Sequence, residues 1–324
     1  MKKKFLGFAL AFVLFGGTIL LSACGTKSDK NKLQVFASFY PLYEFVQRIG
    51  GDKVEVQNIS TGADAHGASP TVKQMAQMSE ADLIVINGAG MESWVDKLGP
   101  SIKAKVLDTS LEVNLIDRIK NGETYDNHEE HTEENHDHED DDHDHGPKDP
   151  HIWLSLKNAV LQLKAIKDKL SALDPQNANY YNQRFMQNKI LFEALDEKYE
   201  TTLSAFADKY FVVSHRAFGY LAYEYDLNQY SLSGVEADKE PDAKTMKEVV
   251  DFMVENNINY IFYHSTENSK GVNAIVNEAN RRGLNAQALE LATAEYLTQE
   301  QKNAGDNYLS LMALNLYNLQ IALA

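Results

Sequence analysis

The sequence predicts an α/β fold of two lobes, each built on a parallel sheet flanked by helices, with one long helix joining them. Apolar, strand-like runs alternate with helical stretches in two separate blocks of the chain. Strand, helix and strand at this spacing are typical of parallel sheets with helices on their faces. A helical stretch of about 30 residues separates the blocks, and such a helix is on the order of 45 Å long, enough to run beside both lobes.

Each block contains four apolar runs that we interpret as strands. In the first block they are LQVFASF (33–39), VEVQNIS (54–60), ADLIVING (81–88) and AKVLD (104–108), with helices expected near 40–50, 69–78 and 91–98. In the second block they are YFVVS (210–214), LNQYSLS (227–233), NYIFYH (259–264) and LNAQALEL (284–291), with helices expected near 243–256, 269–282 and 301–324. These blocks predict an N-terminal lobe at 33–174 and a C-terminal lobe at 207–324.

The linking helix is expected at 175–206. Asp174 can cap its first turn, and Pro175 suits the first helical position. Apolar residues then recur at intervals of three or more, at Phe185, Phe192, Leu195, Tyr199 and Leu203. That spacing predicts one buried face along the helix.

Residues 1–23 are interpreted as a secretory signal peptide. Three lysines precede an apolar run from Phe5 to Leu21, and small residues lead to Cys24, the single cysteine of the chain. The letters LSAC resemble a bacterial lipobox, which implies cleavage before Cys24 and a lipid on that residue. A plain anchor helix is the less favoured alternative, because a span needs roughly 20 apolar residues. We expect an extracytoplasmic lipoprotein, held to the bilayer through Cys24 and a tether at 24–32, with no disulfide.

Acidic residues outnumber basic ones by 47 to 31, and many of them share one segment with histidine. The formal net charge is −16, which argues against nucleic acid as a partner and suits cations. Residues 126–145 hold eleven carboxylates and six histidines, so we expect a disordered, solvated insertion in the N-terminal lobe. We interpret it as a weak collector of zinc, and a mere solvated spacer is the alternative. Its histidines are His128, His131, His136, His138, His143 and His145.

Three other histidines point to a metal site between the lobes. His66 follows the second strand, His215 follows the first strand of the second block, and His151 is expected to open a helix in DPHIWLS. Ligands of open α/β sheets bind beyond the carboxyl ends of the strands, so these side chains would meet at one cleft. A lone histidine at a strand end is more often a capping or loop residue, but three imidazoles from separate segments suit tetrahedral zinc.

Two residues compete for the fourth ligand position. Glu290 lies at the end of the last strand, in QALELATAEYL, and is the best-placed carboxylate. His264 also ends a strand, in NYIFYHSTENS. The pattern of residues leaves this choice nearly even.

The order of these motifs resembles the metal-binding receptor lipoproteins of bacterial ABC importers, specifically their zinc-uptake group. The similarity covers the chain from Leu33 onward and rests on DPHIWLS, SHRAFGYLA, GVEADKEPDAKTM and LELATAEYL. It implies two α/β lobes joined by a rigid helix, and a monomer that delivers Zn²⁺ to a membrane permease. It also implies His66, His151 and His215 as ligands, with a carboxylate at the Glu290 position as the fourth.

The expected ligand set favours zinc binding over the alternatives. Three imidazoles with one carboxylate suit zinc, whereas manganese prefers more oxygen ligands. A hydrolase is less favoured, because HEEHT lacks the spacing of a zinc-protease helix and a filled tetrahedral site leaves no place for a reacting water. A manganese receptor of the same fold, or a metal-binding surface adhesin or buffer, remains the alternative.

Overall fold

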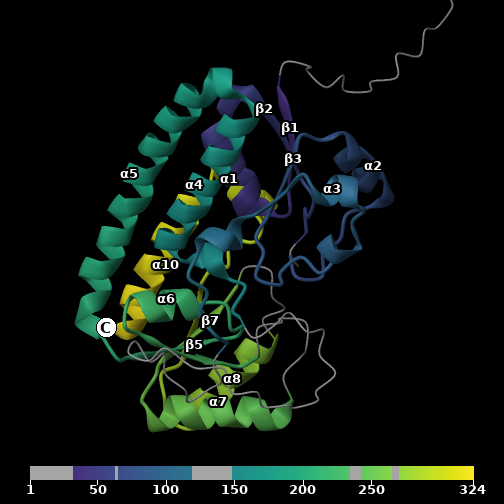
Figure 1. Ribbon diagram of the computed structural model, residues 1–324. Helices are drawn as coiled ribbons and strands as arrows, with labels where there is room; N and C mark the ends of the chain where they lie inside the picture. Colours follow the sequence, from purple (N-terminus) through teal and green to yellow (C-terminus); the bar gives the residue numbers. More distant parts are fainter. Residues whose placement is uncertain (1–31, 63–64, 119–147, 234–241, 265–269) are drawn as a thin grey trace, which may run out of the picture.

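Two four-stranded parallel sheets form the framework of the protein, seen here in a computed structural model. The structure describes residues 32–62, 65–118, 148–233, 242–264 and 270–324. Both sheets are flanked by helices, and a long helix runs along one side of the molecule past both of them (Figure 1). The α/β fold class expected from the sequence is confirmed.

The first sheet has the strand order β2-β1-β3-β4, with every pair parallel. Its central strand β3 is buried at all four positions, as a strand covered on both faces must be. The strands are β1 (Leu33–Ala37), β2 (Val54–Asn58), β3 (Leu83–Ile86) and β4 (Val106–Asp108). All four fall within the runs expected from the sequence.

The second sheet repeats this arrangement with the order β6-β5-β7-β8, again entirely parallel. Its strands are β5 (Tyr210–Val213), β6 (Asn228–Ser231), β7 (Tyr260–Tyr263) and β8 (Gln287–Glu290). In parallel sheets of this kind, ligand-bearing loops leave from the carboxyl ends of the strands, here β2 in the first sheet and β5 in the second. His66 and His215 lie in loops of this kind.

The helices of the first half begin at recognisable caps. Thr71 forms a capping box with Gln74 at the start of α2, and the Ser155 hydroxyl accepts the Asn158 N–H at the start of α4. The helices are α1 (Tyr40–Gly50), α2 (Val72–Glu80), α3 (Pro100–Lys103) and α4 (Leu156–Leu173). Helix α4 packs along the linking helix α5 (Ala178–Leu203), whose 26 residues extend about 39 Å.

The second half contributes α6 (Gly219–Glu224), α7 (Ala243–Glu255), α8 (Lys270–Arg281), α9 (Gln299–Ala304) and α10 (Tyr308–Leu323). One continuous hydrophobic core joins α1, α5 and α10. Its aromatic centre contains Phe192, which stacks on Tyr308 at a centroid distance of 5.4 Å and meets Phe45 edge-on at 5.8 Å. The C-terminal helix therefore packs against residues from both halves of the chain.

Three expectations about helices differ from the structure. The stretch 91–98 forms only a 3₁₀ turn at Val95–Lys97, and 301–324 is divided into α9 and α10 at Gly305, which has a φ of 80°. His151 does not open a helix: it precedes a 3₁₀ turn, and α4 begins only at Leu156.

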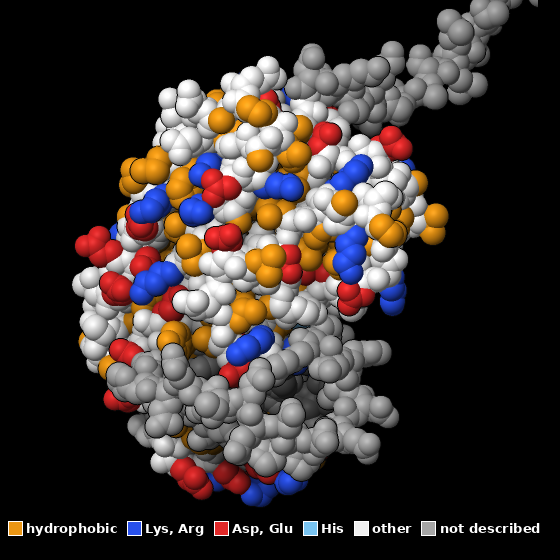
Figure 2. Space-filling model, in the orientation of Figure 1, with side chains coloured by type: hydrophobic (Ala, Val, Ile, Leu, Met, Phe, Trp, Pro, Cys, Tyr) orange, Lys and Arg blue, Asp and Glu red, His pale blue; other side chains and the backbone are white. Residues whose placement is uncertain are grey.

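Acidic and basic side chains are interspersed over the described part of the face shown in Figure 2. Within the described ranges, no helix is both long enough and apolar enough to cross a membrane. The expected signal peptide, Cys24 and the acidic histidine-rich segment 126–145 lie outside the described residues.

Candidate metal centre

Four side chains converge on one point between the two sheets: His66, His151, His215 and Glu295. Each offers one ligand atom, and these atoms all lie within 4.8 Å of one another. His151 is 0% exposed, His215 3% and Glu295 6%, whereas His66 is only partly buried. The structure thus brings together the three histidines expected from the sequence, each from a different segment.

The spacing of the imidazole nitrogens matches a tetrahedral metal site. The Nε2 atom of His151 lies 3.1 Å from that of His66 and 3.3 Å from that of His215. In a zinc site with Zn–N distances of about 2.0–2.1 Å, tetrahedral geometry separates two nitrogens by about 3.3–3.4 Å. The three rings are also inclined to each other, by 59° for His66 and His151 and 74° for His151 and His215. A zinc ion therefore fits this donor set with little rearrangement.

Asp149 fixes the orientation of the His151 ring. Its Oδ1 atom lies 2.8 Å from Nδ1 of His151 and also accepts the His151 backbone N–H at 2.9 Å. The Asp149 side chain is almost fully buried. A carboxylate in this position accepts a hydrogen bond from Nδ1–H, which leaves the lone pair on Nε2 free for the metal and makes the ring a stronger ligand.

The backbone around His151 is held from both halves of the chain. Asn87, after β3, donates from Nδ2 to the Pro150 carbonyl at 2.8 Å. Tyr220, on α6, donates from its hydroxyl to the Asp149 carbonyl at 2.8 Å. These contacts tie the segment that carries His151 to both sheets, so its position depends on how the two lobes sit together.

The loop after β3 that carries Asn87 is itself constrained. The Glu92 carboxylate accepts the backbone N–H groups of Asn87 and Gly88 at 2.8 and 3.0 Å, and burial raises the pKa of Glu92 to about 7. Gly88, Ala89 and Gly90 all have positive φ. A Cβ atom at Gly88 would lie 1.9 Å from Asp108 Oδ1, so this tight turn requires glycine there.

The fourth member of the group is Glu295 and not Glu290, the carboxylate expected from the sequence. After β8 the chain continues through the buried residues 291–294, and Ala294 has a φ of 55°, a left-handed conformation that redirects the backbone. Trp153 donates from Nε1 to the Thr293 carbonyl at 2.7 Å and holds this turn beside His151. The Glu295 Oε2 atom then accepts the Ala65 N–H at 3.4 Å, next to His66.

Glu290 and His264 are not members of this group. Glu290 is the last residue of β8, opposite Tyr263 in the register, and its carbonyl accepts from Asn318 at 2.8 Å. The His264 ring stands 5.8 Å from the His215 ring, and burial lowers the pKa of His264 to about 4. Neither of the two residues that the sequence analysis offers for the fourth position therefore joins the three histidines.

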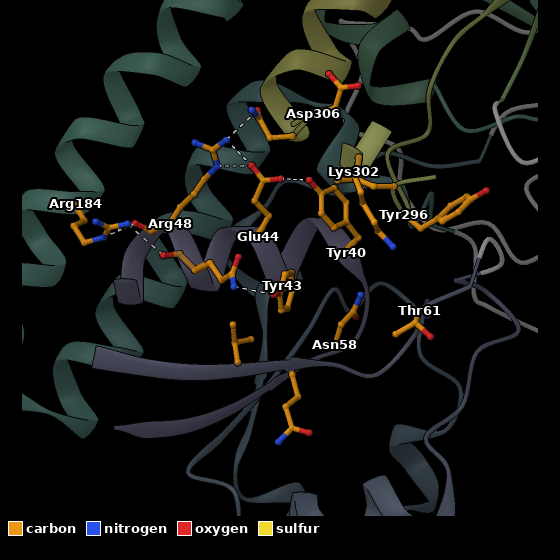
Figure 3. A pocket seen from close by; sticks show the side chains of 15 residues that line it. Tyr40, Tyr43, Glu44, Arg48, Asn58, Thr61, Arg184, Tyr296, Lys302 and Asp306 are labelled. Atoms are coloured by element: carbon orange, nitrogen blue, oxygen red, sulfur yellow. Dashed lines mark hydrogen bonds and ion pairs between the residues drawn. The ribbon is translucent and has the colours of Figure 1, made fainter. Parts of the chain in front are cut away.

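A surface pocket of about 870 Å³ is a feature separate from the metal group (Figure 3). It lies between α1, β2 and the segment that follows Glu295, and no member of the metal group lines it. Glu44 accepts hydrogen bonds there from Tyr40 and Arg48, and also from the Tyr308 N–H at 2.8 Å. This network attaches the start of α10 to α1.

Comparison with known proteins identifies the family. Residues 35–322 match the family model described as ZnuA, zinc-uptake complex component A, periplasmic. The high-affinity zinc uptake system protein ZnuA of Bacillus subtilis is 33% identical over 336 residues, with 100% of this chain and 99% of that protein covered. The zinc-binding lipoprotein AdcA of Streptococcus pneumoniae is 33% identical over 321 residues, which are 99% of this chain and 61% of that protein.

Solved structures of similar proteins share this fold. Zn(II)-bound AdcA of S. pneumoniae superposes with a TM-score of 0.72 at 29% identity, covering 90% of this chain and 57% of that one. The laminin-binding protein Lmb of Streptococcus agalactiae, described as a bifunctional protein with adhesin and metal transporting activity, gives a TM-score of 0.74 at 27% identity, with 90% and 100% covered.

The extent of these matches differs between relatives. The chain spans about 61% of the length of AdcA but nearly all of B. subtilis ZnuA. The family model covers both sheets and the linking helix. By this match, the chain is a member of the ZnuA family, that of the periplasmic component A of the zinc-uptake complex.

Proposed function

We propose that the protein is an extracytoplasmic receptor that captures Zn²⁺ and delivers it to the membrane permease of a bacterial ABC importer. The four ligands we assign are His66, His151, His215 and Glu295. The observation that carries the proposal is the approach of three Nε2 atoms to separations of 3.1 and 3.3 Å between the sheets, with a carboxylate in the same group. Family membership and the names of the relatives support it.

Zinc is favoured over manganese by the composition of the group. Three nitrogen donors and one carboxylate satisfy tetrahedral zinc, whereas manganese favours oxygen ligands in an octahedral arrangement. Burial of the group also favours zinc. Four protein ligands complete a tetrahedral zinc site without water, whereas a metal with a larger coordination number would still need water ligands. The same full set argues for binding rather than hydrolysis, because catalytic zinc keeps one position open for water.

Capture outside the cytoplasm follows from the proposed processing of the chain. Cleavage before Cys24 and lipidation of that residue would hold the receptor at the outer face of the membrane as a monomer. The short tether at 24–32 would keep the metal centre within reach of the permease. Release of the exported protein from membranes on Cys24→Ala would support this arrangement, and full retention after high-salt washing would contradict it.

Adhesion is a second candidate function, favoured by the similarity to Lmb. Binding of the purified protein to immobilised laminin, measured with and without zinc, tests it directly. Saturable binding supports adhesion in addition to metal capture, and absence of binding above an albumin control rules it out.

Metal content tests the central part of the proposal. The purified mature chain, stripped with chelator and then titrated calorimetrically, is expected to bind one zinc tightly and manganese much more weakly. The triple variant His66→Ala, His151→Ala, His215→Ala should lose the tight phase. A tight manganese phase, or tight zinc binding that survives in the triple variant, would contradict the assignment.

A further inference from the structure

Two helices begin or end close to the segments that carry His151 and His215, and one side chain connects them. Ser155 caps α4, four residues after His151, and Glu224 ends α6, nine residues after His215. The Ser155 hydroxyl donates to Glu224 Oε1 and accepts the Asn158 N–H at 3.0 Å. The same hydroxyl thus caps one helix and contacts the end of another.

We propose that Glu224 is a positioning residue of the metal centre. Through Ser155 it holds the segment that carries His151 against α6, the helix that follows His215. This inference rests on the zinc-binding function proposed above. Glu224 contacts no member of the metal group directly. Its effect is expected on the relative placement of His151 and His215, because α4 follows the one and α6 follows the other.

The surroundings of the contact make it sensitive to substitution. Ser155 is fully buried, and Glu224 Oε2 is enclosed without a hydrogen-bond partner. A buried carboxylate oxygen that lacks a partner favours the neutral acid. In keeping with this, burial raises the pKa of Glu224 to about 7, although the Ser155 hydrogen bond opposes the shift.

Charged and titratable groups from three helices surround Glu224. Lys157 on α4 opposes the rise in the Glu224 pKa, whereas Asp196 and Glu200 on α5 add to it. Lys157 is itself paired with Glu200 at 3.0 Å. Two tyrosines complete the set: Tyr225 donates to Asp196 at 2.7 Å, and the neighbouring Tyr308 of α10 also interacts with the Glu224 charge. The environment as a whole therefore penalises ionised Glu224.

This environment makes the stability of the closed arrangement depend on pH. The closed arrangement holds a proton on Glu224 more tightly than water would, so burial of ionised Glu224 destabilises the closed arrangement even though the Ser155 hydroxyl donates to it. Separation of the two segments would admit water and relieve the penalty. Above pH 7, ionised Glu224 should therefore favour release of zinc, while a neutral glutamine should not.

Zinc dissociation tests the inference. The zinc-loaded mature protein is mixed with excess chelator in a stopped-flow instrument, and the dissociation rate is compared among variants at pH 7. Glu224→Ala should raise the rate about tenfold, the lower end of effects seen for residues that orient metal ligands. The control Glu200→Gln, which removes a nearby charge but leaves the Ser155 contact, should stay within about twofold of the unsubstituted protein.

A pH series separates positioning from a loss of packing. Glu224→Gln retains the side-chain shape, so its dissociation rate should equal that of the unsubstituted protein at pH 6 and be several-fold slower at pH 8.5. Equal rates at every pH, or an unchanged rate in Glu224→Ala, would overturn the inference. Failure of the unsubstituted protein to bind zinc would overturn the proposed function as well, whereas tight binding with unaffected variants refutes the inference alone.

Discussion

Asp149 Oδ1 lies 2.8 Å from Nδ1 of His151, and both side chains are almost fully buried. Asp149→Asn should weaken zinc binding by about 10- to 100-fold, because an amide neither fixes the ring nor strengthens it as a ligand to the same degree. Competition with a chromophoric chelator measures the change. The control Asp168→Asn removes an exposed carboxylate on α4 and should have no effect. An unchanged affinity in Asp149→Asn would contradict this role.

The choice between two carboxylates can be tested directly. Glu295→Ala should weaken zinc binding by at least tenfold, because it removes a ligand from the group, while water can partly replace it. Glu290→Ala should leave the affinity within about threefold, because its carboxylate lies outside the group. Calorimetric titration of both variants decides, and a greater loss in Glu290→Ala would restore the assignment made from sequence.

Glu224 should also affect the stability of the zinc-free protein. Its pKa of about 7 lies above the ordinary carboxyl value of 4.5, so the folded state binds the proton more tightly than the unfolded state. The free energy of unfolding should therefore fall as pH rises from about 4.5 to 7. Glu224→Gln should match the unsubstituted protein at pH 4.5 and exceed it in stability at pH 8 in urea unfolding. A constant difference across this range would argue against the assigned titration.

Deletion of residues 126–145 tests the role of the acidic histidine-rich segment. The deletion removes six histidines and eleven carboxylates but none of the four ligands assigned here. We expect the intact protein to bind one tight zinc and several weaker ones, and the deletion variant to retain only the tight one. Thermal stability without zinc should barely change, because the segment has few apolar residues to bury. Loss of the tight zinc would mean that the segment supplies a ligand.

Sequence patterns predicted the strands well because the strands are short, apolar and separated by helices. All eight lie inside the runs chosen from the sequence, and three histidines placed after strands or beside the DPHIW motif meet in the structure. The carboxyl ends of parallel strands meet at one edge, so residues far apart in sequence could be expected to converge. The positions of His66 and His215 thus follow from topology, whereas His151 is recognised by its motif.

Glu295 could not be found in this way. Glu290 ends its strand, as expected for a ligand at the carboxyl end of a parallel sheet. The residue that joins the histidines lies five residues later, after a left-handed turn at Ala294. A non-glycine residue with positive φ gives no clear signal in the sequence, because tertiary contacts impose this backbone conformation. The contact from Trp153 to the Thr293 carbonyl is such a contact.

The predicted helix boundaries are wrong where a capping residue lies inside the predicted helix. Ser155 starts α4, and reading His151 as the first residue of a helix ignored this capping serine. Gly305 and Asn307 likewise end α9 and start α10 within a stretch that was read as one helix. Both errors lie in local signals that the sequence did contain.

X-ray absorption at the zinc K-edge tests the central claim most directly. The mature chain loaded with one zinc per molecule, with residues 126–145 deleted to remove weaker sites, should show four light-atom ligands at about 2.0–2.1 Å. Multiple scattering should correspond to three imidazoles, and Glu295→Ala should change only the remaining oxygen shell. A spectrum with six oxygen-rich ligands, or with fewer than three imidazoles, would contradict a centre formed by His66, His151, His215 and Glu295.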